Sequence, residues 1–398
     1  MASARWIKKD ALALPSSFLY SIRMWKLGCA AVVWFSVLLA NAQIPTPTQA
    51  LTLEQQGKLA EAENSWRRIT QADPQDAAAF ASLGLVLSKQ GKYGQAVPAY
   101  RKAIALNPQL PGVHLNWGLA EFKQSHFEAA VAPLVAALAA DPENLQARTL
   151  LGLSCYGAKR FADAAKYLEL SAKSDPTNME LHGVLAQSCL LAKKYSCALA
   201  EFRQILEQAP DSAAAHMLSG EALDGLGRTA EAITEFEAAL KMAPREPNAN
   251  FGLGYLYWKL HKYDEAKGVF ESELSIDPGH AQALAYLGDI ELKRNAPEKA
   301  LPLLNKAIHL RNDIRIAYLD IGAILSEQKR YQEALVALLR AEKLDPAQPD
   351  AHYRLARLYR AMGNAAAAQR EFARVGELNE KAEDMAPKMS GPLPALPQ

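Results

Sequence analysis

Proline recurs in this chain of 398 residues at a constant step of 34 residues, and this period constrains the fold more than any other feature. The recurring prolines are Pro74, Pro108, Pro142, Pro176, Pro210, Pro244, Pro278 and Pro346. Asn312 takes the one place in the series that proline leaves out. A period of about 20 to 50 residues is typical of stacked repeats, in which each unit contacts only its neighbours. Length alone would favour roughly two or three globular domains, and the repeat overrides it.

Three further positions of the repeat, which we call columns, carry the same kind of residue every 34 residues. Together they indicate two helices in each unit. Alanine recurs from Ala62 to Ala368, and a large apolar residue follows it four positions later, from Trp66 to Phe372. A small residue, usually glycine, recurs from Gly84 to Ala356. We expect the small residue of the first helix to face the alanine of the second, with the large residue filling the space beyond. Gly, Lys or Asn marks the turn between the helices, and a proline ends most units because it cannot continue a helix.

These columns resemble the tetratricopeptide repeat, whose pattern of W, L-G, Y, A, F and P recurs every 34 residues or so. The stretch AFASLGLVLSKQGKYGQAVPAYRKAIALNP is similar to one such unit. The resemblance covers residues 43–382 as ten units without an insertion. It implies an all-α fold, a right-handed superhelical solenoid of tandem helix-turn-helix repeats. We expect the first helix to begin near Thr48, after Pro45 and Pro47, and residues 383–398 to form a disordered, proline-rich tail.

Residues 1–42 have the pattern of an export signal. Arg23 and Lys26 precede an apolar run over residues 27–40, and Ala40-Asn41-Ala42 provides small residues for cleavage. Met24 is an alternative start of the chain. The run has 14 residues, fewer than the roughly 20 that a spanning helix needs, so a retained anchor is the weaker alternative. We expect an exported protein, periplasmic or secreted, that contacts a membrane only through an uncleaved signal segment or a partner complex.

The resemblance also implies a binding surface. In this family the first helix of each unit lines a concave groove that binds extended peptides or partner helices, through about five positions of the unit. In unit seven, three of these positions are Phe251, Tyr255 and Trp258. Further groove residues are Leu115, Leu119, Phe122, Leu153, Tyr156, Tyr286, Tyr353, Arg357 and Arg360. Aromatic residues left on such a face favour a ligand, and the alternative is that they pack on each other or on the tail.

Basic residues accompany these apolar positions and suggest the charge of the ligand. Lysine recurs at the thirteenth position of four units. These residues are Lys89, Lys123, Lys259 and Lys293. Together with the two arginines of unit ten, they favour a ligand with apolar anchors and a carboxylate end.

The sequence carries no motif for chemistry. It lacks G-x-x-x-x-G-K-[ST], H-E-x-x-H and G-x-S-x-G, so we expect no enzyme and no cofactor. Histidine occupies the fourth position of four units, where we interpret it as a substitute for a large residue and not as a metal ligand, because the units stack roughly 10 Å apart. These residues are His114, His182, His216 and His352. With 44 basic and 43 acidic residues, no charge excess favours nucleic acid.

Three cysteines follow the signal. Cys155 and Cys189 share one position of units four and five, and Cys197 lies just beyond the helical turn from Cys189. We favour buried thiols for all three. A Cys189–Cys197 disulfide is the alternative in an oxidising compartment, if the two Cα atoms lie within about 7 Å.

These observations predict a non-catalytic scaffold that holds a partner protein or peptide, in extended or helical form, in its groove. The alternative is a structural or assembly component of a cell-envelope, polysaccharide-export or secretion machine, in which the edges and the convex face make the contacts. The two differ in whether the aromatic groove residues are needed for binding.

Overall fold

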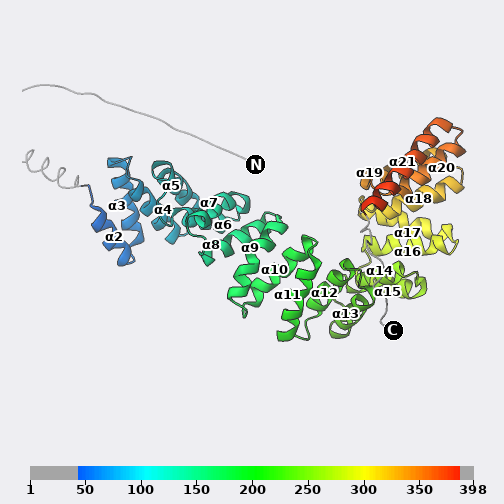
Figure 1. Ribbon diagram of the computed structural model, residues 1–398, viewed down its shortest axis with the longest axis horizontal. Coiled ribbons are helices and arrows are strands. Elements are labelled where there is room, and N and C mark those ends of the chain that lie inside the picture. The colour runs from blue at the N-terminus through cyan, green and yellow to red at the C-terminus, as the bar shows by residue number, and fades with distance from the viewer. Residues whose placement is uncertain (1–43, 386–398) are drawn as a thin grey trace, which may run out of the picture. The chain divides into compact units, whose positions relative to one another are not determined.

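The computed structural model describes residues 44–385, which form twenty helices and no strand within that range (Figure 1). The chain divides between His126 and Phe127 into two compact parts. The helices of the first part are α2 (Pro47–Gln55), α3 (Leu59–Ala72), α4 (Ala77–Lys89), α5 (Tyr93–Leu106) and α6 (Val113–Lys123). The predicted all-α repeat fold is confirmed, since helices alternate with short turns throughout the described range.

The second part contains the remaining helices, and each one packs against the next along the chain. They are α7 (Phe127–Ala140), α8 (Leu145–Gly157), α9 (Phe161–Ser174), α10 (Met179–Leu191), α11 (Tyr195–Gln208), α12 (Ala213–Gly225), α13 (Thr229–Met242), α14 (Ala249–Lys259), α15 (Tyr263–Ile276), α16 (Ala281–Lys293), α17 (Pro297–Leu310), α18 (Arg315–Glu327), α19 (Tyr331–Leu344), α20 (Pro349–Ala361) and α21 (Ala365–Met385). The even-numbered helices are the first helices of their units.

The turn between the two helices of a unit has the same backbone geometry every time. One residue in each turn adopts the left-handed conformation, with φ between 58° and 79°. These residues are Gly57, Gly91, Ser125, Lys159, Lys193, Gly227, His261, Asn295, Lys329 and Gly363. At the end of α8, Lys159 N–H donates to the Tyr156 carbonyl and Arg160 N–H to the Cys155 carbonyl, each at 2.8 to 2.9 Å. This is the Schellman arrangement, which satisfies carbonyls that the helix end leaves open.

The small and large columns pack as the sequence predicts. A Cβ atom placed on Gly254 would lie 2.7 Å from Cε1 of Phe270, and one placed on Gly152 would lie 2.5 Å from Cδ2 of Leu168. A Cβ on Gly288 would also lie 3.4 Å from the carbonyl oxygen of Ala300. Each first helix therefore approaches its second helix so closely that the large side chain occupies the space a Cβ would need.

Units three and seven depart in the same way from the usual start of a first helix, since Gly112 before α6 has φ 71° and no side-chain cap, and α6 has 11 residues. Most units end with a polar residue that caps the next helix, as when Asn178 accepts a hydrogen bond from Leu181 N–H. In unit seven Pro247 is followed by Asn248, which has φ 65° and no side-chain cap, so α14 has 11 residues where α16 has 13. The shorter helix presents the aromatic residues of unit seven.

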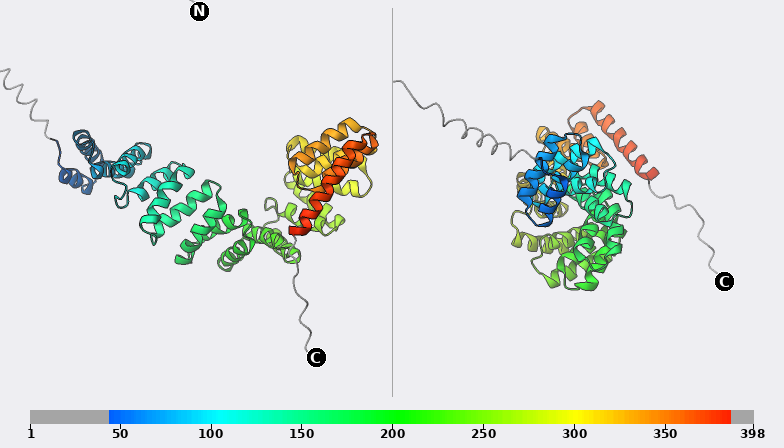
Figure 2. Two further views of the ribbon diagram at one scale, coloured as in Figure 1. Left: turned by 45° about the horizontal axis from the view of Figure 1, so that its top comes forward. Right: turned by 90° about the vertical axis from the view of Figure 1, so that its left-hand side faces the viewer.

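Both ends of the predicted solenoid can be compared with the helices. The first helix, α2, begins at Pro47 with Thr46 as its cap, one residue before the predicted start. The last helix, α21, has 21 residues and continues to Met385, the last described residue and three residues past the predicted boundary at 382 (Figure 2, red). Glu380 stands where most other units have their closing proline, so the helix is not stopped there. The predicted signal and most of the predicted tail lie outside the described residues. Within 44–385, none of the helices is long and apolar enough to cross a membrane.

Three histidines of the fourth position connect the two helices of their own units. His182 Nδ1 lies 2.6 Å from Glu201 Oε2, and His216 and His352 make the same contact with Glu235 and Glu371 at 2.6 and 2.7 Å. Each glutamate lies 19 residues after its histidine. The interpretation as simple substitutes for a large residue was therefore incomplete, since the pair adds a polar link between the helices. Among residues 44–385, no group of His, Cys, Asp and Glu could hold a metal ion.

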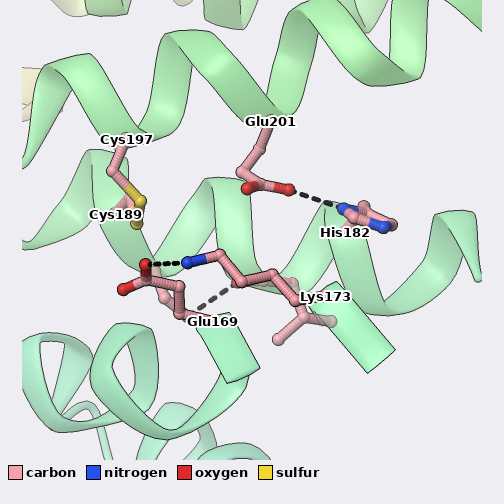
Figure 3. Close-up of a disulfide and its surroundings, with 8 residues drawn as sticks. Glu169, Lys173, His182, Cys189, Cys197 and Glu201 are labelled. Atoms are coloured by element: carbon pink, nitrogen blue, oxygen red, sulfur yellow. Dashed lines mark hydrogen bonds and ion pairs between the residues drawn. A yellow bond between two sulfur atoms is a disulfide. The ribbon is translucent and has the colours of Figure 1, made fainter. Parts of the chain in front are cut away.

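Cys189 and Cys197 form a disulfide in the structure, with their Cα atoms 5.8 Å apart (Figure 3). The favoured interpretation of free thiols was wrong for this pair and holds for Cys155, which is a buried free cysteine. The turn between α10 and α11 brings the two side chains together, because Lys193 reverses the chain with φ 58°. Burial raises the pKa of the Cys155 thiol to about 11.

The disulfide gives a prediction about alkylation and stability. Under denaturing, non-reducing conditions, iodoacetamide is expected to label Cys155 and to spare Cys189 and Cys197 until a reductant is added, as peptide mass spectrometry would reveal. Because the bridge closes a loop of only 8 residues, reduction should lower the free energy of unfolding by about 2 kcal/mol. A Cys155→Ser variant is the matched control: it keeps the Cys189–Cys197 bridge, so reduction should lower its free energy of unfolding by the same amount as in the wild type. Labelling of Cys197 without reduction would contradict the pairing.

Candidate functional site

The second part contains a cavity of about 640 Å³ among the first helices of its last four units, α14, α16, α18 and α20. Tyr255, Trp258 and Tyr286 form an aromatic wall. Two buried carboxylates, Asp289 and Asp320, line the cavity, and we call it the aromatic–acidic pocket. The helices that supply these residues contact each other in order, α14 with α16, α16 with α18 and α18 with α20. The stacking of the repeats thus brings residues as far apart in the sequence as Tyr255 and Arg354 to the same cavity.

The aromatic wall consists of rings that contact one another. The Trp258 and Tyr286 ring centroids are 4.9 Å apart, and Tyr255 lies 5.6 Å from Tyr286 and 6.0 Å from Trp258. Behind them Phe251 lies 5.8 Å from the fully buried Phe270 and 5.9 Å from Tyr286. Packing of the aromatic residues on each other, one of the two alternatives raised by the sequence, is therefore present for all four rings. Tyr255, Trp258 and Tyr286 are also half-buried and line the pocket, and binding of a ligand there stays a prediction.

The two carboxylates of the pocket have different partners. Asp289 accepts a hydrogen bond from Trp258 Nε1 at 2.6 Å, and its other oxygen lies 3.3 Å from Lys293 Nζ. Asp320 Oδ1 lies 3.6 Å from Arg354 Nη2, and Asp320 Oδ2 has no hydrogen-bond partner among the described residues. Both aspartates are less than 5% exposed. Burial, and then the nearby Asp289 charge, raise the pKa of Asp320 to about 8.

Sequence reasoning missed these two carboxylates, because their residue type alone does not distinguish them. Asp289 and Asp320 lie inside first helices, but so do Glu121 of α6 and Glu221 of α12. The proximity of Asp289 to Asp320 could not be predicted, since it depends on how neighbouring units stack.

The recurrent lysines have ion-pair partners, which changes the expected charge of the ligand. Lys89 Nζ lies 3.2 Å from Glu54 Oε2, and Lys259 Nζ lies 2.8 Å from Asp224 Oδ1. In both pairs the carboxylate is 35 residues earlier, on the first helix of the preceding unit. Lys293 pairs with Asp289. Three of the four lysines thus already have a carboxylate beside them, which weakens the argument for a ligand with a carboxylate end.

The remaining predicted groove residues lie elsewhere on the first helices. In the first part, α6 carries Leu115, Leu119 and Phe122, and in the second part α8 carries Leu153 and Tyr156. All five are half-buried. Tyr156 Oη donates to Gln187 Oε1 of α10 at 2.6 Å.

On α20, two of the predicted groove residues are arginines that stack on aromatic rings. The Arg357 guanidinium lies 6.0 Å from the Tyr353 ring, and the Arg360 guanidinium lies 4.9 Å from the Phe372 ring. Arg357 also borders a smaller cavity of about 290 Å³ between α18 and α20. Of the twelve predicted groove residues, three line the aromatic–acidic pocket: Tyr255, Trp258 and Tyr286.

Sequence comparison decides the family. A family model described as tetratricopeptide repeat matches residues 48–111, 115–178, 185–247, 220–281 and 251–315, which is more than half of the chain. Two further repeat models match residues 322–363 and 350–379. The chain belongs to the tetratricopeptide repeat family. Its repeat fold is that of a protein–protein interaction scaffold, and no curated protein matches the chain.

Solved structures similar to this repeat protein are distant. YrrB, a tetratricopeptide repeat protein described as having an unusual peptide-binding site, is 23% identical over 46% of this chain and 98% of its own, with a TM-score of 0.36. MamA is 21% identical over 42% of this chain and 96% of its own, with a TM-score of 0.35. Human IFIT1, solved as a dimer with m7Gppp-AAAA, is 18% identical over 83% of this chain and 80% of its own, with a TM-score of 0.38.

Proposed function

We propose that this repeat protein holds a segment of a partner polypeptide, extended or helical, against the first helices of its last four units. The observation that carries the proposal is the aromatic–acidic pocket, in which three half-buried rings line a cavity of about 640 Å³. Aromatic side chains offer a large apolar area with little conformational entropy to lose, so they often dominate binding at interfaces. Tyr255, Trp258 and Tyr286 would supply the apolar anchor points.

The decisive variant removes two of the three rings. Replacing Tyr255 and Trp258 together with alanine is expected to weaken partner binding at least tenfold, because buried aromatic anchors contribute more than about 1.4 kcal/mol each in typical interfaces. Affinity capture with the purified full chain, quantified by mass spectrometry, measures the change.

The control is Tyr167→Ala on α9, a half-buried tyrosine outside the pocket. Circular dichroism should show unchanged helicity in both variants. Partners that remain bound to the double variant at the level of the control would contradict binding in the pocket.

A second candidate function, assembly into a cell-envelope, polysaccharide-export or secretion machine, is supported by a different surface. On α19, a second helix, Val336 is 71% exposed and Leu339 is 41% exposed. Two apolar side chains three positions apart share one helix face and could contact a neighbouring subunit. Copurification with a complex that is lost on Val336→Asp and kept in the Tyr255 and Trp258 double variant would favour this function.

We propose further that the protein is exported, to the periplasm or the medium, and that it has no catalytic activity of its own. The support for export is the basic, apolar and small-residue pattern of residues 1–42. The intact mass of the chain from the exported fraction tests it, because cleavage after Ala42 predicts a mature protein that begins at Gln43. A chain found in the cytoplasm with its first residues in place would contradict it.

A further inference from the structure

Asp320 of the aromatic–acidic pocket is 1% exposed, and no donor in residues 44–385 reaches its Oδ2 atom. Its side chain can hydrogen-bond to Asp289 only while one of the two carboxyl groups keeps a proton. Arg354 Nη2 lies 3.6 Å from the other oxygen of Asp320, beyond ordinary hydrogen-bond distance. Buried polar atoms without a partner are rare because each is destabilising. Two carboxyl groups that line a cavity and can pair with each other only by keeping a proton are therefore a place for a cationic donor from outside the chain.

The aromatic wall of the same pocket is suited to a positive charge. Aromatic faces attract ammonium and guanidinium groups, and tryptophan does so most strongly. The Trp258 ring already has Lys293 Nζ at 6.0 Å, and its indole N–H donates to Asp289. A cation that entered between Trp258 and Asp320 would meet a ring on one side and a carboxyl group on the other.

The charged residues at the rim of the pocket do not favour an anion. Arg311 pairs with Asp313, and Arg315 pairs with Asp350 through Nη2, so both guanidinium groups already have a carboxylate partner. Arg315 Nε is a second buried atom without a hydrogen-bond partner, and it is a donor. A polypeptide can satisfy both unpartnered atoms, since its backbone carbonyl accepts from Arg315 and a basic side chain donates to Asp320. A simple amine would satisfy only one.

We infer that the aromatic–acidic pocket binds a basic side chain, lysine or arginine, of an extended partner segment, with the cation between the Trp258 ring and the carboxyl group of Asp320. This inference rests on the proposed function and names the chemistry that the same pocket selects. It reverses the sign expected from the sequence, which was a ligand with a carboxylate end.

Protonation makes this binding depend on pH. The charged groups that face Asp320 are Asp289 and Lys293 of α16 and Arg354 of α20. Because the pKa of Asp320 is raised to about 8, its carboxyl group holds a proton at neutral pH. A bound cation favours the ionised carboxylate, so binding releases a proton and strengthens as the pH rises from 6 toward about 8.

The test titrates the full-length protein with three capped peptides, Ac-Gly-Ala-Lys-Ala-Gly-NH₂ and its Gln and Glu counterparts. The probe is the indole N–H resonance of Trp258, assigned with the Trp258→Phe variant. We expect the Lys peptide to bind about tenfold more tightly than the Gln peptide, and the Glu peptide to bind more weakly still. Asp320→Asn should reduce the Lys preference about tenfold and leave the Gln peptide unchanged. Equal binding of the three peptides, or the tightest binding by the Glu peptide, would overturn the inference.

Two controls separate the inference from the proposed function. Asp313→Asn removes the same charge from the exposed rim and should leave the Lys preference in place. If the Tyr255 and Trp258 double variant loses its partners while the wild-type pocket binds the Lys and Gln peptides equally, the proposed function stands and the inference fails. If the double variant retains its partners, the proposed function fails. The Trp258 indole resonance is also compared between the wild type and Lys388→Gln without any peptide. A shift in the variant would show that the chain's own tail occupies the pocket, and it would contradict binding of a partner there.

Discussion

Phe270→Ala is expected to lower the free energy of unfolding of the second part by about 3 to 5 kcal/mol, the typical loss for a buried phenylalanine. The Phe270 side chain is fully buried, and its ring lies 5.8 Å from both the Phe251 and the Tyr286 rings. It also occupies the space that a Cβ on Gly254 would need. The cavity left by alanine would thus remove the support of α14, α15 and the aromatic wall together.

The Phe270→Ala variant should lose stability in particular helices and not evenly along the chain. In a repeat protein each unit is stabilised mainly by its neighbours, so a defect in one unit can uncouple the units on either side. Hydrogen exchange followed by mass spectrometry should show protection lost first in α14 to α16, with α8 to α10 retained. Urea unfolding should become less cooperative.

The matched control for Phe270→Ala is Val336→Ala, which shortens a side chain that is 71% exposed. Its effect should stay within about 0.5 kcal/mol, as for most surface substitutions. A Phe270→Ala protein that unfolds at the same urea concentration as this control would contradict the packing described for units seven and eight.

The repeat columns explain why so much of the fold could be predicted from the sequence. Contacts such as Gly254 with Phe270 lie within one unit, so they follow from a residue type at a fixed position of the period. The same is true of the turns, where the left-handed position accepts Ser125 or His261 as well as glycine. His182 and Glu201 also pair within a unit, but nothing in their spacing alone distinguishes this contact from others across the turn.

The pocket could be predicted only in part, because it depends on contacts between units. Tyr255 and Trp258 were predicted as groove residues from their positions in the family pattern. The partners of Lys89 and Lys259 lie 35 residues earlier, one unit and one position away, and they become visible only when the stacking is known. The proximity of Asp320 to Asp289 has the same origin.

Asp320→Asn is expected to stabilise the second part by about 1 to 3 kcal/mol at pH 7 to 8, the range typical of a buried polar group without a partner. The asparagine amide keeps the shape of the side chain and cannot carry a negative charge next to Asp289. Its N–H groups can donate hydrogen bonds to the Asp289 carboxylate. The wild-type carboxyl group, by contrast, must stay protonated in the folded chain at neutral pH, since its pKa is raised from 3.8 to about 8.

The direction of the pH dependence follows from the two pKa values. Below about pH 3.8 the carboxyl group is protonated in both the folded and the unfolded chain, so it does not affect stability. Between about 3.8 and 8 the unfolded chain has released the proton and the folded chain has kept it. The free energy of unfolding therefore falls as the pH rises through this window, and the full loss is present above about pH 8. Asp320→Asn should remove this part of the slope, as urea unfolding at a series of pH values would measure.

Asp313→Asn provides the contrast, because Arg311 holds the pKa of the exposed Asp313 carboxyl group below its usual value. Loss of the Asp313 carboxyl group should leave the free energy of unfolding between pH 4 and 8 almost unchanged. A variant Asp320→Asn that is less stable than wild type at pH 8, or that keeps the same slope, would show that Asp320 has a stabilising partner. If instead the variant is more stable and has also lost its preference for the Lys peptide, stability and binding conflict at this residue. Such a conflict is expected where a buried ionisable side chain binds a ligand and at the same time destabilises the folded protein.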